Sequence, residues 1–216
     1  MLITQDVDHD GDPDVLIAWP SSGDMGQSGR VVWCSSKTGR EVSGLTVSKE
    51  ATRVAEFGRA IACLDDIDND GRPDIAVSLL KYEPKGIVDA IRYYSCASGM
   101  LLREVTSADV PGLGELLFSI RDVDGDARSD LVLVAPAGGF GEADSAPGGA
   151  VRLVSGTNGK QIWHRVFPLK NNRTGRRGGT SCGDVNGDGV IDIHLKGLIE
   201  DYVISGRTGD IICTLK

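Results

Sequence analysis

The sequence has few aromatic residues, few histidines and no excess of positive charge. Phe, Trp and Tyr make up 5% of its 216 residues, whereas glycine occurs 29 times, a balance typical of short strands joined by tight turns. The formal net charge of −8 would repel phosphate groups, which disfavours nucleic acid as a partner. No apolar run approaches the length of about 18 residues that spans a bilayer, so we expect no membrane insertion.

Signatures of common catalytic chemistry are missing as well. The sequence has no GxSxG, Walker, HExxH or paired CxxC motif, and its three histidines are spread along the chain as His9, His164 and His194. The odd number of cysteines leaves at least one thiol unpaired within the chain, and the sequence leaves open whether one disulfide forms among the others. We interpret the five as small, mostly buried strand residues: Cys34, Cys63, Cys96, Cys182 and Cys213.

What the sequence does contain is a repeat with two landmarks. Four acidic segments align without gaps, as DVDHDGDPD (6–14), DIDNDGRPD (66–74), DVDGDARSD (122–130) and DVNGDGVID (184–192), and they start 60, 56 and 62 residues apart. A small-residue turn follows each one, as SKTG, CASG, GTNG and GRTG, ending at Gly39, Gly99, Gly159 and Gly209. Such periodicity predicts a repeat architecture.

Short apolar stretches flank both landmarks and predict four strands per repeat. They precede the loops as LIT, AIACL, LLFSI and GTSC and follow them as VLIAW, IAVSLL, LVLVA and IHL. Before the turns stand GRVVWCS, AIRYYSC, GAVRLVS and DYVIS, and after the turns REV, MLLREV, QIWHRV and DIICTL. Residues 21–29, 137–149 and 170–179 are predicted to be loops because Gly, Ser, Asn and Arg dominate them.

We therefore predict an all-β protein, specifically a β-propeller of about four blades with four antiparallel strands each, and a β-sandwich is the alternative. The whole chain, 1–216, is expected to be one domain with repeats at about 1–50, 51–108, 109–168 and 169–216. A closed four-bladed ring, an open arc from a larger ring and a ring completed by a second chain are all compatible with the sequence. The last two imply self-association or a fragment of a larger propeller.

The acidic segments have the oxygen pattern of a loop that wraps a hard cation, with side chains at positions 1, 3, 5 and 9 and a backbone carbonyl at position 7. About four Ca²⁺ ions, one per repeat, would supply +8 and balance the formal charge of −8. Solvated acidic turns are the alternative. The predicted side-chain ligands are Asp6, Asp8, Asp10 and Asp14; Asp66, Asp68, Asp70 and Asp74; Asp122, Asp124, Asp126 and Asp130; and Asp184, Asn186, Asp188 and Asp192. The predicted carbonyl ligands belong to Asp12, Arg72, Arg128 and Val190.

Two positions of the loop are diagnostic. Glycine at position 6 permits a sharp reversal, but the third loop has Ala127 there, so we expect the third site to be the weakest or most distorted. Position 12, where an EF-hand needs a bidentate Glu, is apolar in every repeat, as Ile17, Val77, Leu133 and Leu195. This argues against EF-hand and dockerin loops.

The combination resembles the FG-GAP repeat family, the calcium-binding blades of integrin α-subunit propellers and of many exported bacterial proteins. Phe57-Gly58 stands where the FG of the family falls, and Trp19-Pro20 and Ala135-Pro136 stand near its GAP. The first repeat has no room for FG, and the fourth has Gly178-Gly179 in its place. The resemblance implies that the acidic loops are metal sites at the residues given above.

The resemblance also implies a non-catalytic adhesion or recognition module for a protein or glycan. A calcium-stabilised propeller enzyme acting on polysaccharide is the alternative. Lys170, Arg173, Arg176 and Arg177 form a basic patch that could contact an acidic partner, and Trp19, Trp33 and Trp163 are expected to be packing residues. We expect an extracellular, cell-surface or periplasmic location; because MLITQDVDHDGD contains no signal peptide, the chain is expected to be a fragment or to have an upstream start.

Overall fold

The computed structural model describes residues 1–4, 6–20, 27–48, 54–84, 86–107, 113–136, 149–167 and 172–216. Strands are the only extended regular elements among these residues, and every pairing between them is antiparallel. The all-β prediction is therefore confirmed. The chain divides into two compact units, Met1–Ala108 and Asp109–Lys216, and each is described separately.

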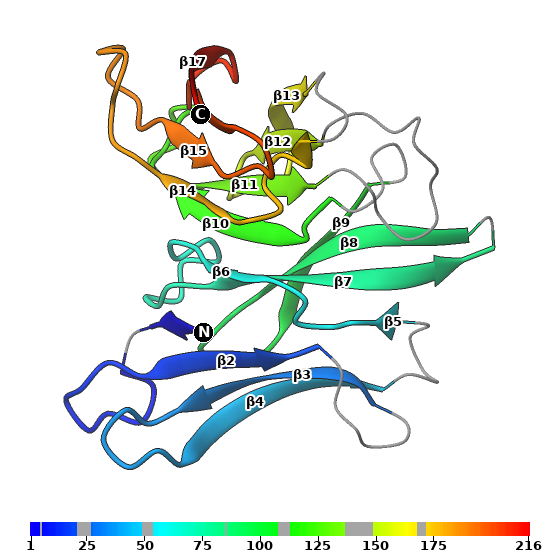
Figure 1. The fold of residues 1–216 in the computed structure, drawn as a ribbon. Coiled ribbons are helices and arrows are strands. Elements are labelled where there is room, and N and C mark those ends of the chain that lie inside the picture. Colours follow the sequence, from blue (N-terminus) through cyan, green and yellow to red (C-terminus); the bar gives the residue numbers. More distant parts are fainter. Residues whose placement is uncertain are drawn as a thin grey trace. The chain divides into compact units, whose positions relative to one another are not determined.

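The first unit holds two sheets, each built from strands that follow one another along the chain (Figure 1). One sheet has the order β1-β2-β3-β4. In the other, β5 and β6 both pair with the same edge of β7, and β8 and β9 follow. The bounds are β1 Leu2–Ile3, β2 Val15–Trp19, β3 Gln27–Cys34, β4 Glu41–Ser48, β5 Val54–Ala55, β6 Ile61–Cys63, β7 Ile75–Glu83, β8 Gly86–Tyr94 and β9 Leu101–Ser107.

The second unit repeats the same pattern twice, with the strand orders β10-β11-β12-β13 and β14-β15-β16-β17. Each strand pairs with the next along the chain, which is the simplest antiparallel topology and needs only short connections. The bounds are β10 Leu116–Ile120, β11 Asp130–Ala135, β12 Ala150–Val154, β13 Gln161–Val166, β14 Gly179–Ser181, β15 Ile193–Leu195, β16 Asp201–Ile204 and β17 Ile211–Leu215.

In each unit, apolar side chains from both sheets pack into a shared cluster. In the first unit Leu16 and Trp33 lie opposite each other on β2 and β3 and pack in the same cluster as Val77 of β7. In the second unit Val132 of β11 and Ile193 of β15 share a cluster. Because side chains alternate between the two faces of a strand, the continuous burial of β11 and of the first five residues of β7 shows that these strands are covered on both faces.

The FG dipeptide is part of the first core. Phe57 is fully buried and contacts Tyr94 edge to face, with ring centroids 5.8 Å apart. Gly58 has a φ of +89°, and its N–H donates to the Ser78 carbonyl. In the fourth repeat the residue that makes the equivalent bond, to the carbonyl of Lys196, is Gly175, so the placement of this feature at Gly178-Gly179 was wrong.

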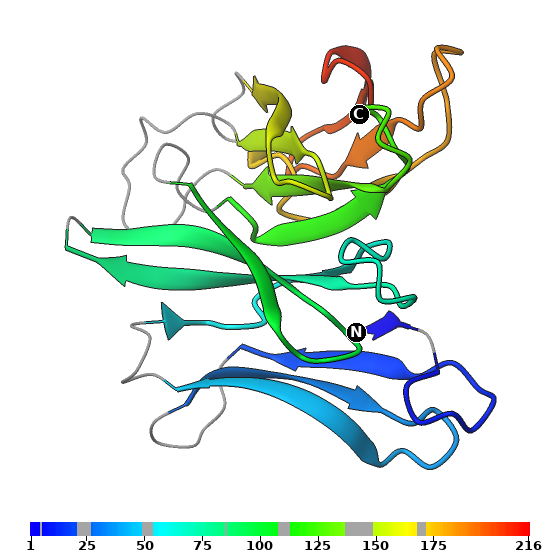
Figure 2. The same cartoon turned by 180° about the vertical axis from the view of Figure 1, so that it is seen from behind.

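Most of the predicted strands coincide with observed ones, and two differences stand out. The short strand β5 was not predicted, since two residues carry no periodic signal. The β7–β8 hairpin is also longer than predicted (Figure 2). Its strand pairing continues as far as the Tyr82–Ile87 and Glu83–Gly86 pairs. The predicted loops 21–29 and 170–179 are strand at residues 27–29 and at Gly179; much of the three predicted loops lies outside the described residues.

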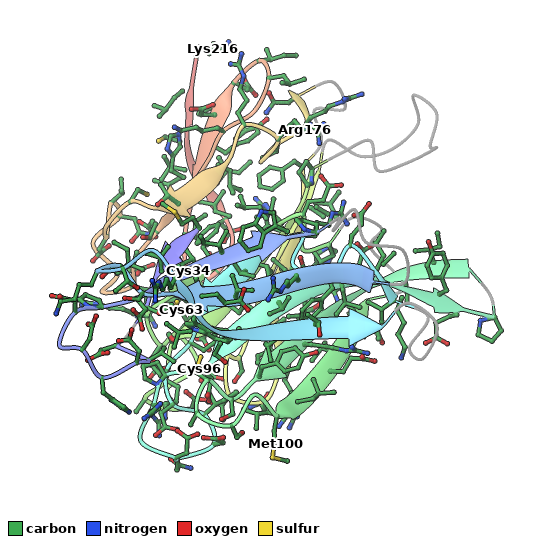
Figure 3. All side chains as sticks on the ribbon, turned by 90° about the horizontal axis from the view of Figure 1, so that it is seen from below. Cys34, Cys63, Cys96, Met100, Arg176 and Lys216 are labelled. Atoms are coloured by element: carbon green, nitrogen blue, oxygen red, sulfur yellow. The ribbon has the colours of Figure 1, made fainter. Side chains whose placement is uncertain are left out.

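The cysteine prediction was only partly right. All five carry free thiols; four are partly buried and Cys182 is exposed, so none is a fully buried core residue. Cys96 and Cys182 lie outside the strands. Burial raises the pKa of Cys63 and, more strongly, of Cys96, two of the residues labelled in Figure 3. Both thiols are therefore poor nucleophiles near neutral pH.

Candidate metal centre

The acidic loops occupy one recurring place in the fold. In each sheet the loop connects two neighbouring antiparallel strands: β1 to β2, β6 to β7, β10 to β11 and β14 to β15. The turn between the third and fourth strands lies beside it, since Val15, the residue after the first loop, pairs with Cys34, which lies two residues before SKTG. Loop and turn therefore meet at the same end of each sheet.

The side chain at position 1 organises the loop. In the first repeat the two carboxylate oxygens of Asp6 accept the N–H groups of Asp10 and Gly11, at 3.1 and 2.9 Å. Donors at positions 5 and 6 bind position 1 in the same way in every repeat, at 2.7–3.2 Å. These bonds fold the backbone around one carboxylate and turn later side chains toward it.

Positions 3, 5 and 9 are held by further backbone donors. The N–H of position 5 donates to the position-3 oxygen, and the N–H of position 7 donates to the position-5 oxygen, at 2.9–3.2 Å. The N–H of position 2 donates to the position-9 carboxylate at 2.7–2.9 Å. The position-9 residues, Asp14, Asp74, Asp130 and Asp192, are fully buried.

Oxygen atoms converge as a result. One carboxylate oxygen from each of three aspartates lies within 4.8 Å of the others in the first three loops. Positions 1, 3 and 5 form this group in loops one and two, whereas positions 1, 3 and 9 form it in loop three. In the fourth loop Asn186 stands at position 3, and its amide nitrogen donates to Asp188 at 3.0 Å.

The donor set fits a hard cation, which prefers carboxylate and amide oxygens over nitrogen or sulfur. A further sign is the side chain of Asp14, since its Oδ1 is buried without a hydrogen-bond partner among the described residues. In the other three repeats the corresponding oxygen accepts a backbone N–H from the neighbouring turn. That the backbone carbonyls at position 7 also bind the cation stays a prediction.

Backbone conformation explains two of the loop positions. At position 6, φ is +94° for Gly11, +92° for Gly71 and +86° for Gly189, and the non-glycine residue Ala127 has +66°. Position 4 is also left-handed in every loop, a constraint that the sequence analysis did not identify. Its residues are His9, Asn69, Gly125 and Gly187, all types that tolerate positive φ.

The pKa values of the loop carboxyls are shifted in opposite directions. The Gly11 N–H lowers the pKa of Asp6, and the Val190 N–H lowers that of Asp188, since hydrogen bonds favour the charged form. Burial raises the pKa of Asp74 and of Asp130, because removal from water penalises the charged form. A cation would relieve that penalty.

Basic side chains of the neighbouring turn contact the first and fourth loops. Lys37, in the first turn, lies 3.7 Å from a carboxylate oxygen of Asp12, and Arg207, in the fourth turn, donates to the Asp188 carbonyl at 2.8 Å. The corresponding residues of the second and third turns are Ala97 and Thr157, which carry no charge. The first and fourth loops therefore receive a positive charge from the turn, whereas the second and third loops carry an arginine of their own at position 7, Arg72 and Arg128.

In the structure each turn begins one residue before its sequence motif, at a serine that sequence reasoning missed, because the N–H of the final glycine donates to the serine carbonyl at 2.8–2.9 Å. Its hydroxyl lies within hydrogen-bond distance of the position-5 carboxylate in all four repeats. The residue before SKTG, CASG, GTNG and GRTG is serine each time, and this agreement is the signal that could have revealed it. The four are Ser35, Ser95, Ser155 and Ser205.

The remaining candidate residues form no common centre among the described residues. His9 pairs with Arg72 at 2.9 Å, while His194 pairs with Asp201 at 2.9 Å in the other unit. Of the basic patch, Arg173, Arg176 and Arg177 are exposed (Arg176 is labelled in Figure 3), and Lys170 lies outside the described residues. Arg176 is 3.5 Å from Glu115.

The tryptophans divide into two kinds. Trp33 and Trp163 are buried, as expected of packing residues, and the Trp163 indole donates to the Gly206 carbonyl at 2.8 Å. Trp19 is 46% exposed at the end of β2, so the expectation of packing fails there. The described residues also contain no helix long and apolar enough to cross a membrane.

Fold and loops together define a class: all-β repeat proteins in which clustered aspartates connect the strands of each sheet. Residues 6–77 match the FG-GAP-like repeat, which supports the resemblance given by the motifs. Among solved structures, the chain is similar to the V. cholerae biofilm matrix protein Bap1, at 13% sequence identity and a TM-score of 0.41. That match covers 99% of this chain and 38% of the other protein.

Proposed function

We propose that this chain is a calcium-binding FG-GAP repeat protein whose four sheets are propeller blades, acting as a non-catalytic adhesion or recognition module for a protein or glycan. The observation that carries the proposal is the recurrence of one oxygen-rich loop in four copies. Each copy holds its side chains at positions 1, 3, 5 and 9 with the same backbone donors.

Calcium, when bound, would supply positive charge to carboxylates that the fold brings together. The residues that would hold it are the side chains at positions 1, 3, 5 and 9 of each loop. The first three loops need such charge because the fold brings three carboxylates close together in each, and the position-9 carboxylate is buried in all four loops. We therefore propose that calcium ties each loop to its sheet and so makes the module calcium-dependent.

Blade architecture is supported by the strand order. A propeller blade is a four-stranded antiparallel sheet that follows the chain, as the sheets of this protein do, with one first-strand position split between β5 and β6. Ring closure with four blades, completion by a second copy and membership of a larger ring predict different masses and shapes. Sedimentation of the calcium-loaded protein distinguishes them.

An extracellular, cell-surface or periplasmic location is part of the proposal, because calcium is plentiful there and scarce in the cytosol. A recognition role would use residues away from the loops, such as the exposed Trp19 and the exposed arginines of the basic patch. Stacking of Trp19 on a sugar ring is one contact that its exposure allows.

The test has two parts. Equilibrium dialysis with ⁴⁵Ca²⁺ should find about four bound ions per chain, and none after replacement of the position-1 aspartates by alanine. The protein should then be screened against immobilised glycans and extracellular proteins, with and without chelator, while product release is monitored. Calcium-dependent binding without turnover is expected; turnover of a polysaccharide would refute the non-catalytic role.

A further inference from the structure

The turn that faces each acidic loop begins with a serine that is almost completely buried. The exposed fractions of the four residues are 1, 0, 1 and 3% in chain order. The hydroxyl oxygens lie 3.4, 2.9, 3.4 and 3.2 Å from Oδ2 of the position-5 aspartate in the facing loop. The serines are Ser35, Ser95, Ser155 and Ser205, and their aspartates are Asp10, Asp70, Asp126 and Asp188.

The hydrogen bonds around the hydroxyl fix its direction. In the second repeat the Ser98 N–H donates to the Ser95 hydroxyl oxygen at 3.2 Å. Because that oxygen acts as an acceptor within the turn, its own proton is available to the carboxylate of Asp70, which lies 2.9 Å away. The same arrangement recurs in the other three turns.

The position-5 carboxylate is thereby held at both oxygens. In the second repeat Oδ1 of Asp70 accepts the N–H of Arg72 at 2.9 Å, and Oδ2 accepts the hydroxyl of Ser95. The backbone of the turn also reaches position 9, since the Cys96 N–H donates to Oδ1 of Asp74 at 3.3 Å. One turn therefore orients two predicted ligands that come from a different hairpin.

We propose that the first serine of each turn is a positioning residue for the cation site, and that it couples cation binding to the hairpin of the third and fourth strands. This inference rests on the proposed calcium binding. Groups that hydrogen-bond metal ligands typically change metal affinity by about 10–100-fold when they are removed. The strongest case is Ser95, which has the shortest contact and is completely buried.

The test is a calcium titration followed by two-dimensional NMR of the full chain. The Gly71 N–H, which donates to Asp66 at 2.9 Å, reports on the second loop, and the Gly11 and Gly189 N–H groups report on the first and fourth. Ser95→Ala should weaken calcium binding at the Gly71 reporter by about 10–100-fold and leave the other two midpoints unchanged. Ser95→Thr, which keeps the hydroxyl, should restore most of the affinity.

Ser98→Ala is the matched control, since Ser98 is an exposed serine of the same turn and its hydroxyl contacts Met100 rather than the loop. It should leave the Gly71 midpoint unchanged. An unchanged midpoint in Ser95→Ala would overturn the inference, as would an equal loss in the control. If Ser95→Ala does not fold, Ser35→Ala read at Gly11 decides the question in the same way.

The proposed function fails differently. If the wild-type chain shows no calcium-dependent shift at any of the three glycines, calcium binding itself is refuted and the role of the serine falls with it. If the wild type titrates and the serine variants match it, calcium binding stands and only the positioning role is refuted.

Discussion

Ala127 stands in a backbone conformation that the other three loops give to glycine, and replacing it should stabilise the protein. Its φ is +66°, in the left-handed region, which costs an L-residue about 1–2 kcal/mol. Glycine removes that cost but gains freedom in the unfolded chain, worth about 0.4–1 kcal/mol. Ala127→Gly should therefore raise the free energy of unfolding by about 0.5–1 kcal/mol.

The reverse change at the same loop position is a matched control. Gly71 has a φ of +92°, and a Cβ built there would meet no atom within 4 Å, so Gly71→Ala changes backbone strain without a steric clash. It should lower the free energy of unfolding by about 0.5–1 kcal/mol, the same magnitude with the opposite sign. The two substitutions thus have opposite signs at equivalent positions.

Urea unfolding followed by circular dichroism measures both effects, and it should be run with and without chelator. In chelator the difference reports the backbone alone; in calcium, Ala127→Gly should gain additional stability if the third loop binds most weakly. If Ala127→Gly lowers the stability in chelator, or if Gly71→Ala leaves it unchanged, the argument from left-handed strain is refuted.

Three further substitutions test other parts of the account. Lys37→Ala should tighten calcium binding at the first loop severalfold by removing a competing charge, read at the Gly11 amide; weaker binding would contradict this. Burial acts to raise the pKa of Glu104, but Lys81 and Arg92 outweigh it and lower that pKa. This carboxylate therefore stabilises the fold at pH values above its unfolded-state pKa, and the stabilisation is lost as the pH falls through the lowered folded-state pKa. Glu104→Gln should flatten that acid limb in urea titrations, and an unchanged limb would disprove it. Phe57→Ala should cost about 3–5 kcal/mol by opening a cavity in the first core, and a loss below 1 kcal/mol would refute its central place there.

The strand pattern was readable from the sequence because short apolar runs and turn residues are local signals. The acidic loops carried the same kind of signal, since aspartates at a fixed spacing accept hydrogen bonds from backbone N–H groups only a few residues away and so set the loop conformation. Position 12 illustrates this: Val77, Leu133 and Leu195 are buried in strands and Ile17 is half-buried in one, as the exclusion of EF-hands requires.

What could not be read depends on contacts between segments far apart in the sequence. The hydrogen bond between Ser95 and Asp70 joins residues 25 positions apart, and no rule of residue spacing predicts it. The left-handed backbone at position 4 was hidden because His9, Asn69 and two glycines look unrelated until their φ angles are compared. The two-residue strand β5 depends on the extended β7 edge rather than on its own propensity.

Thermal unfolding of the purified full chain, in excess calcium and after exhaustive EDTA treatment, tests most directly whether the clustered aspartates hold calcium. Binding to the folded state alone stabilises it by about 2.7 kcal/mol per site at a calcium concentration of a hundred times Kd. The account predicts a melting temperature several degrees higher in calcium, reversed by EDTA. Identical melting temperatures in the two conditions would contradict it.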